Sequence, residues 1–215
     1  MSARPRPEEA GRLLVRYGAE APEAAVLLLH GGRADGLGAP PLLNLPALRM
    51  RPFAEAVRRA ARRRPVLVAE GRYRHRGWNG ERADAARDAE TALAGLRTRF
   101  GEVPVVLVGH SMGGRAALAV AGDPAVRGVV ALAPWCPPGE PVAHLAGRRI
   151  HLLHDETDRV TAARDSWEFV RRAREAGADA TGVPMPAGGH TMLLGAGLWH
   201  RRATELALET LAADR

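Results

Sequence analysis

The stretch VPVVLVGHSMGGRAALAVA, residues 103–121, decides the fold. Its apolar beginning, residues 103–108, is typical of a buried strand, and its alanine-rich end is typical of a helix. Between them, Gly109, Ser111 and Gly113 satisfy the pattern G-x-S-x-G. In a strand–turn–helix context this pattern predicts a sharp, strained turn that presents the serine hydroxyl above a sheet. The alternative is an ordinary glycine-rich turn, which the flanking strand and helix patterns disfavour.

Short apolar runs recur along the chain, with helical patterns between them. Strands that are buried on both faces read as continuous apolar runs of this kind. The expected strands are residues 25–29, 66–69, 103–108, 129–132, 150–153 and about 180–185. Two expected helices follow Pro52 and Gly113, and three more span about residues 85–100, 162–176 and 198–211. The alternation predicts an α/β fold with a mostly parallel central sheet flanked by helices. Ligands of such sheets bind at the carboxyl ends of the strands.

The composition favours one domain of ordinary size. Apolar residues make up 46% and charged residues 26% of the 215 residues, which excludes wholesale disorder. We interpret residues 1–215 as a single domain and residues 1–11 as a flexible tail. No apolar run approaches the length of a membrane span, and no signal-peptide pattern opens the chain, so we expect a cytoplasmic protein with no membrane partner. Cys136 is the single cysteine, which excludes an internal disulfide and a cysteine-based zinc site.

The charge balance is basic and entirely due to arginine. Lysine and arginine together number 31 against 24 acidic residues, for a net charge of +7, and the sequence contains no lysine. A nucleic-acid-binding module is one interpretation of so much arginine. The basic residues are scattered, however, and the loss of lysine is typical of a GC-rich bacterial genome. We therefore expect no nucleic-acid partner.

A general base and an acid for Ser111 follow later in the chain. A serine hydroxyl is a poor nucleophile at neutral pH and needs a base, and His190 lies on a glycine-rich loop between the last expected strand and helix. The strand at residues 150–153 runs into HDETDRVT, residues 154–161, which offers Asp155, Glu156 and Asp158 as the acid. A carboxylate is needed to orient the histidine and to stabilise its cation. The order serine, acid, histidine is one that occurs in enzymes of this fold class.

Backbone donors for an oxyanion are expected after the first apolar strand. That strand ends in His30-Gly31-Gly32-Arg33, where glycine lets the backbone approach a substrate closely. We expect one N–H donor from Gly32, with Arg33 as the alternative, and a second donor from Met112, directly after the serine. A His-Gly-Gly turn alone would be only a turn or a phosphate-binding candidate.

These four pieces together resemble the α/β-hydrolase superfamily over nearly the whole chain. The resemblance rests on residues 30–32, 109–113 and 189–190, and on His154 followed by Asp158-Arg159-Val160. It implies that Asp158 is the acid, four residues after His154. Asp155 stands where the family usually has glycine, and it remains an alternative or an auxiliary acid. Within the superfamily, the length and spacing are similar to small dienelactone-hydrolase-like and acyl-protein-thioesterase-like enzymes.

The spacing also predicts a site without a lid. Residues 135–149 alone separate two expected strands where many family members insert a helical lid, so we expect no sizeable cap domain. The substrate pocket would then be formed by short loops, and we expect Arg33, Tyr73, Trp78 and Trp135 to line it. We expect no metal and no cofactor, although the histidines near residues 151–158 raise a metal interpretation.

The favoured function is hydrolysis of carboxylic esters or thioesters of small acyl groups through an acyl-enzyme on Ser111. His190 would act as the base, Asp158 would orient it, and Gly32 and Met112 would bind the oxyanion. The substrate would be a small-molecule acyl ester or thioester. Two alternatives use the same fold: an acyltransferase with the same triad, and a non-catalytic protein that binds a partner.

Overall fold

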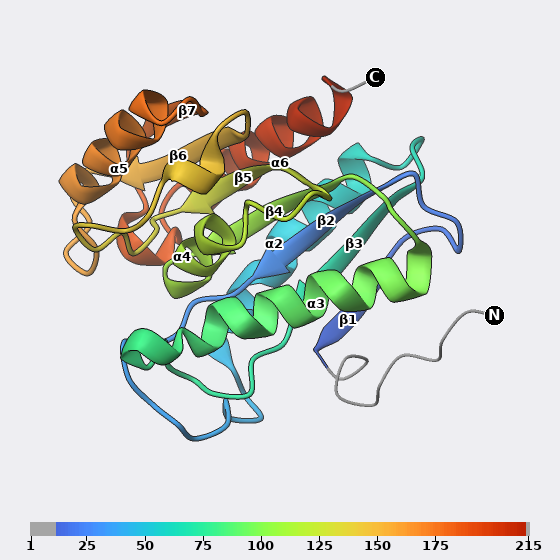
Figure 1. The fold of residues 1–215 in the computed structure, drawn as a ribbon, viewed down its shortest axis with the longest axis horizontal. Coiled ribbons are helices and arrows are strands. Elements are labelled where there is room, and N and C mark those ends of the chain that lie inside the picture. Colours follow the sequence, from blue (N-terminus) through green and yellow to red (C-terminus); the bar gives the residue numbers. More distant parts are fainter. Residues whose placement is uncertain (1–11, 214–215) are drawn as a thin grey trace.

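A seven-stranded sheet lies between two layers of helices (Figure 1) in the computed structural model, which describes residues 12–213. The tail expected at residues 1–11 lies outside the described residues. The strands are β1 Leu13–Tyr17, β2 Ala24–Leu29, β3 Val66–Gly71, β4 Val105–His110, β5 Val126–Leu132, β6 Arg149–Asp155 and β7 Asp179–Met185. The helices are α2 Leu45–Ala60, α3 Asp84–Phe100, α4 Met112–Ala119, α5 Ala163–Glu175 and α6 Ala196–Ala212, with 3₁₀ turns η1 Gly80–Arg82, η2 Ala143–Leu145 and η3 Gly189–Thr191.

The strand order is β1-β3-β2-β4-β5-β6-β7, and every pair is parallel except β1 with β3. The six expected strands are confirmed, with small shifts in their bounds. Strand β1 was not expected. It has five half-buried or exposed residues at the edge of the sheet, so it lacks the continuous apolar signal of a central strand.

The two faces of the sheet carry separate hydrophobic clusters. Strand β2 is buried along its whole length, and its side chains alternate between the clusters as strand geometry requires. Helices α3, α4 and α5 cover one face together with Leu27 and Leu29, and helices α2 and α6 cover the other together with Val26 and Leu28. The central strands therefore need apolar side chains on both faces.

Helix α2 begins earlier than its sequence pattern suggested. We expected Pro52 to start it, but the helix begins at Leu45, Pro46 lies in its first turn, and Pro52 lies inside it. An interior proline removes one helical hydrogen bond. Packing of Met50 and Phe53 into the core stabilises the helix on both sides of Pro52, and local propensity yields to this tertiary contact.

The carboxyl ends of the parallel strands meet at one edge of the sheet, where the loops carrying the candidate residues gather. The connection between β5 and β6 contains only η2, as expected for a fold without a lid inserted there. No helix among residues 12–213 is long and apolar enough to cross a membrane.

Candidate active site

Ser111 occupies the turn between β4 and α4 in a strained conformation. Its φ is 55° and its ψ is −118°, values that a residue with a side chain rarely adopts. Three backbone hydrogen bonds hold it there: its N–H donates to the carbonyl of Leu132 at 3.0 Å, and its carbonyl accepts from the N–H groups of Arg115 and Trp135 at 3.1 Å each. The hydroxyl is therefore presented by a turn fixed from both sides.

The glycines of this turn are required by space. A Cβ added at Gly109 would overlap the carbonyl of Gly113, and one added at Gly113 would overlap the carbonyl of Leu29 at the end of β2. The first contact closes the turn on itself. The second brings the start of α4 against the strand that leads to the His-Gly-Gly segment.

His190 lies between Ser111 and Asp158. Its Nε2 is 2.9 Å from Oγ of Ser111, and its Nδ1 is 2.9 Å from Oδ2 of Asp158. In the neutral tautomer that fits both contacts, Nδ1–H donates to the carboxylate and Nε2 accepts from the serine hydroxyl. The three residues come from the loops after β4, β6 and β7, and form one continuous chain of hydrogen bonds.

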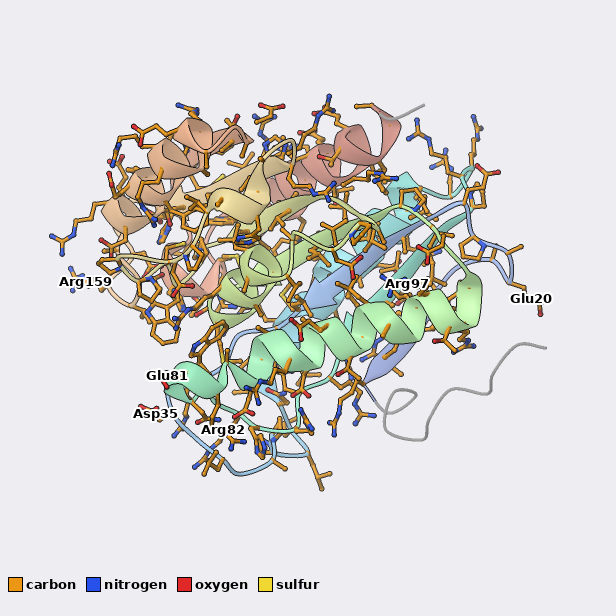
Figure 2. The ribbon with its side chains drawn as sticks, in the orientation of Figure 1. Glu20, Asp35, Glu81, Arg82, Arg97 and Arg159 are labelled. Carbon is orange, nitrogen blue, oxygen red and sulfur yellow. The ribbon has the colours of Figure 1, made fainter. Side chains whose placement is uncertain are left out.

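The Asp158 side chain is inaccessible to solvent (0%) and is surrounded by donors. Oδ1 accepts from the N–H of Val160 at 2.7 Å and of Thr161 at 3.2 Å, and Oδ2 accepts from the Thr161 hydroxyl at 2.9 Å. Burial by itself raises the pKa of this carboxyl, but the hydrogen bonds from Val160 and His190 outweigh it, so the pKa lies below the ordinary aspartate value. Its neighbour Arg159 is exposed at the edge of the molecule (Figure 2).

A second histidine contacts the same carboxylate. His154 is completely buried, and its Nε2 lies 3.2 Å from Oδ2 of Asp158 and 3.1 Å from the carbonyl of Thr161. On its other side, Nδ1 lies 2.7 Å from the Ser166 hydroxyl. Burial lowers the pKa of His154, so the ring is neutral and Nε2–H is the donor. Its role as a support for Asp158 was missed by sequence reasoning, which used His154 only as a landmark.

Asp155 has a different set of partners from Asp158. Its Oδ1 accepts from the N–H and the hydroxyl of Thr157 at 2.8 Å each, and its Oδ2 accepts from the N–H of Gly189 at 2.7 Å. Burial by itself raises the pKa of Asp155. The hydrogen bonds from Gly189 and Thr157 outweigh this effect, so the pKa lies below the ordinary aspartate value. No hydrogen bond joins Asp155 to the His190 ring within the described residues, so it anchors the loop that carries His190.

His110, the residue before Ser111, contacts the loop that carries His190. Its Nε2–H donates to the carbonyl of His190 at 2.8 Å. Burial, with a smaller contribution from the nearby His190, lowers the pKa of His110 to about 3. The ring is therefore neutral, and the loop of His190 is fastened at its backbone by both His110 and Asp155.

Gly32 and Met112, the expected oxyanion donors, are neighbours beside Ser111. A Cβ added at Gly32 would overlap the end of the Met112 side chain, and one added at Gly31 would lie 3.4 Å from Cβ of Ser111. Met112 is the first residue of α4, so its N–H has no acceptor within the helix. Arg33, the alternative donor, uses its N–H in a bond of 3.0 Å to the carbonyl of Arg76.

The four residues expected to line the pocket are placed differently from one another. Arg33 is exposed and Trp135 is half-buried, whereas Tyr73 and Trp78 are each only 5% exposed. Tyr73 packs against the ring of His30, with ring centroids 4.4 Å apart. The structure therefore brings Arg33 and Trp135 to the surface and puts the other two rings inside.

The guanidinium of Arg115 covers Trp78. It lies 3.9 Å from the Trp78 ring centroid and 4.4 Å from that of Trp135, a double cation–π contact. Glu140 accepts a hydrogen bond from Arg115 at 2.5 Å. Because Arg115 lies one turn after Ser111 in α4, this cluster ties the loop at residues 135–140 to the serine helix. Among residues 12–213, no group of three or more acidic, histidine or cysteine side chains is arranged to hold a metal ion.

One family model matches part of the chain. The model, described as serine aminopeptidase S33, matches residues 70–151. This segment contains Ser111 and ends before Asp158 and His190. No curated protein matches the sequence significantly.

Solved structures match nearly the whole chain at low sequence identity. A thermophilic esterase of Thermogutta terrifontis with propionate bound is 19% identical, with a TM-score of 0.69 over 93% of this chain and 88% of that chain. Est1E from Butyrivibrio proteoclasticus with ferulic acid bound is 12% identical, with a TM-score of 0.68 over 93% and 95%. MGS-M1, an α/β-hydrolase enzyme from a Medee basin deep-sea metagenome library, is 16% identical, with a TM-score of 0.67 over 88% and 85%.

The sheet order, the strained serine turn and these similarities agree. The chain has the α/β-hydrolase fold. The expected fold class is confirmed.

Proposed function

We propose that the protein is a serine hydrolase that cleaves carboxylic esters or thioesters of small acyl groups. The observation that carries the proposal is the unbroken chain from Oγ of Ser111 through the His190 ring to Asp158, with both contacts at 2.9 Å. This arrangement gives a serine a base within hydrogen-bond reach and gives the base a fixed tautomer.

In the first half of the reaction, Oγ of Ser111 attacks the acyl carbon while Nε2 of His190 takes its proton. The buried, ionised Asp158 stabilises the imidazolium that forms, and it holds the ring in line with the serine. As the tetrahedral intermediate collapses, His190 gives the proton to the leaving oxygen or sulfur, and the acyl group stays on Ser111.

The negative oxygen of that intermediate needs donors that are already in place. The N–H groups of Gly32 and Met112 are assigned this role, because both residues lie beside Ser111. Met112 is also the first residue of helix α4. The amino-terminal end of the helix further stabilises the negative charge. Preorganised donors of this kind contribute on the order of 10²–10³ in rate.

In the second half, His190 takes a proton from water, which attacks the acyl carbon. The acid leaves, and the proton returns to Ser111, so the enzyme is regenerated. An ester and a thioester would follow the same steps, since they differ only in the leaving atom.

Small acyl groups are supported by the connections around the site. The β5–β6 connection provides no lid helix, and Trp78, which could have formed a deeper wall, is covered by Arg115. Structural neighbours with propionate or ferulic acid bound support small ester substrates.

A fluorophosphonate probe tests the proposal directly, because it reacts with activated serines. We expect wild-type protein to be labelled at Ser111 alone, with Ser166, another buried serine, as an internal reference in the peptide map. The Ser111→Ala variant should show neither labelling nor turnover of p-nitrophenyl acetate. Unlabelled wild-type protein, or turnover that survives Ser111→Ala, would refute the proposed function and favour a binding protein.

A further inference from the structure

A cavity of about 450 Å³ opens beside the start of the His-Gly-Gly segment. It lies between the first turns of α2, the loop before them, and the ends of β1 and β3. His30, two residues before Gly32, forms part of its wall. The cavity therefore lies beside the end of β2 that leads to Gly31 and Gly32.

The charged side chains of this cavity are mostly arginines. Its single carboxylate, Glu70, is only 7% exposed and already accepts a hydrogen bond from Arg16 at 2.7 Å. Arg51 and Arg72 also line it, and among residues 12–213 neither has an acidic partner. Because Arg16 and Glu70 neutralise each other, the positive charges of Arg51 and Arg72 remain without compensation.

Helix α2 adds a positive end to the same cavity. Asn44, Ala47 and Arg51, from its first turns, line the wall. Asn44 makes no capping hydrogen bond with its side chain, and the first turn contains no acidic residue. The N–H groups at the start of a helix favour an anion, and the first turn of α2 provides no acidic side chain to meet them.

Tyr73 contributes a further part of the cavity wall. The hydroxyl of Tyr73 is inaccessible to solvent and has no hydrogen-bond partner among the described residues, and Tyr73 lines the cavity. Burial raises the pKa of this phenol, so it remains a donor at neutral pH. The same wall holds Oε1 of Glu70, which is also buried without a hydrogen-bond partner among the described residues.

We infer that this cavity binds a carboxylate carried on the acyl part of the substrate, so that the preferred substrates are half-esters of short dicarboxylic acids. Arg51, Arg72 and the α2 terminus bind the carboxylate. The inference rests on the proposed ester hydrolysis at Ser111 and assigns the class of ester.

Three p-nitrophenyl esters of equal chain length test it: the neutral hexanoate, the anionic hemiadipate and the cationic 5-trimethylammoniopentanoate. For wild-type protein at neutral pH, we expect kcat/KM for the hemiadipate to exceed that for the hexanoate by about tenfold or more, as for hydrogen bonds to a charged group. The cationic ester should be the poorest of the three. Preference for the cationic ester would instead mean that Glu70 dominates the cavity and would overturn the inference.

Matched charge variants locate the effect. Arg51→Gln with Arg72→Gln should reduce the hemiadipate-to-hexanoate ratio by about tenfold. Arg62→Gln with Arg63→Gln removes the same charge from an exposed turn and should leave the ratio within about twofold of wild type. An equal loss of this ratio in both double variants would indicate only long-range attraction between the protein and the anionic ester. It would refute the cavity as the carboxylate site.

The outcomes separate this inference from the proposed function. Turnover of the hexanoate without any preference for the hemiadipate would refute the carboxylate site and leave the hydrolase intact. Absence of turnover for all three esters, with no fluorophosphonate labelling, would refute both.

Discussion

The carboxylate of Asp155 accepts a hydrogen bond from the backbone N–H of Gly189 at 2.7 Å, one residue before His190. Strand β6 and the loop after it therefore contribute two different aspartates to the site. Asp158 contacts the His190 ring, whereas Asp155 holds the backbone from which the ring projects.

This division of roles predicts a ranking of two variants. Asp158→Asn should lower kcat by about 10³–10⁴, because the amide favours the wrong histidine tautomer. Asp155→Asn should cost far less, about tenfold, with a lowered melting temperature, because it loosens the loop without touching the ring. Steady-state kinetics on p-nitrophenyl acetate and thermal melts measure both effects. A reversed ranking would show that the resemblance used for Asp158 misassigns the acid.

Ser111 and His190 should behave as one unit. Either Ser111→Ala or His190→Ala is expected to remove nearly all turnover, about 10⁴-fold or more, and the double variant should be little worse. The reason is that the base has no function without the hydroxyl it activates. Additive losses in the double variant would contradict a shared role, and circular dichroism of each variant controls for folding.

The Thr161 hydroxyl is predicted to support the acid. It lies 2.9 Å from Oδ2 of Asp158 and 3.1 Å from Nδ1 of His190. Thr161→Val keeps the shape and removes this donor, so kcat should fall about tenfold, as expected for a hydrogen bond to a charged group. Thr161→Ser keeps the hydroxyl and should retain most of the activity. Equal losses in both variants would indicate a packing role for the methyl group instead.

Acid should destabilise the protein through its buried histidines. An unfolded histidine binds a proton near pH 6.5, whereas folded His110 resists protonation down to a pKa of about 3. Below about pH 6.5 the unfolded chain binds more protons, so stability is fully present above that pH and declines as the pH falls towards about 3.

Thermal melts across this range measure the effect. His110→Gln should flatten the decline, because glutamine does not titrate, while its amide can still donate to the carbonyl of His190. Arg62→Gln, a change of an exposed side chain that does not titrate in this range, serves as the control and should keep the wild-type slope. An unchanged slope in His110→Gln would show that other groups cause the acid sensitivity.

The absence of a lid between β5 and β6 predicts a preference for short acyl chains. An open site buries little of a long chain and forgoes about 0.8 kcal/mol per methylene. We expect kcat/KM to be highest from acetyl to hexanoyl p-nitrophenyl esters, with no increase at a lipid interface. A preference of about tenfold or more for dodecanoyl over butanoyl, roughly 1.4 kcal/mol, would require an enclosed acyl tunnel.

Much of the fold and of the site could be predicted from sequence because the signals are local. The central strands are continuous apolar runs, and the serine turn needs glycines at set positions. Ser111, Asp158 and His190, expected to act together, do lie together. Their catalytic roles stay predictions.

The remainder depends on long-range contacts that no local pattern shows. Strand β1 is defined by antiparallel pairing with β3, and helix α2 extends through Pro52 because its packing stabilises it. The burial of Trp78 depends on Arg115, from a different helix. Similarly, residues 154–161 contain Asp155 and Thr161, but their sequence does not indicate in which direction these side chains point.

The position of His190 after β7 has a consequence for biosynthesis. The ribosome completes the serine turn first, then Asp158, the proposed acid, and last His190, the proposed base. Strand β7 is at the edge of the sheet and pairs only with β6, so it can add after the other strands have assembled. Under the proposed function, a growing or carboxyl-terminally clipped chain would carry Ser111 without its base and would not hydrolyse acyl esters.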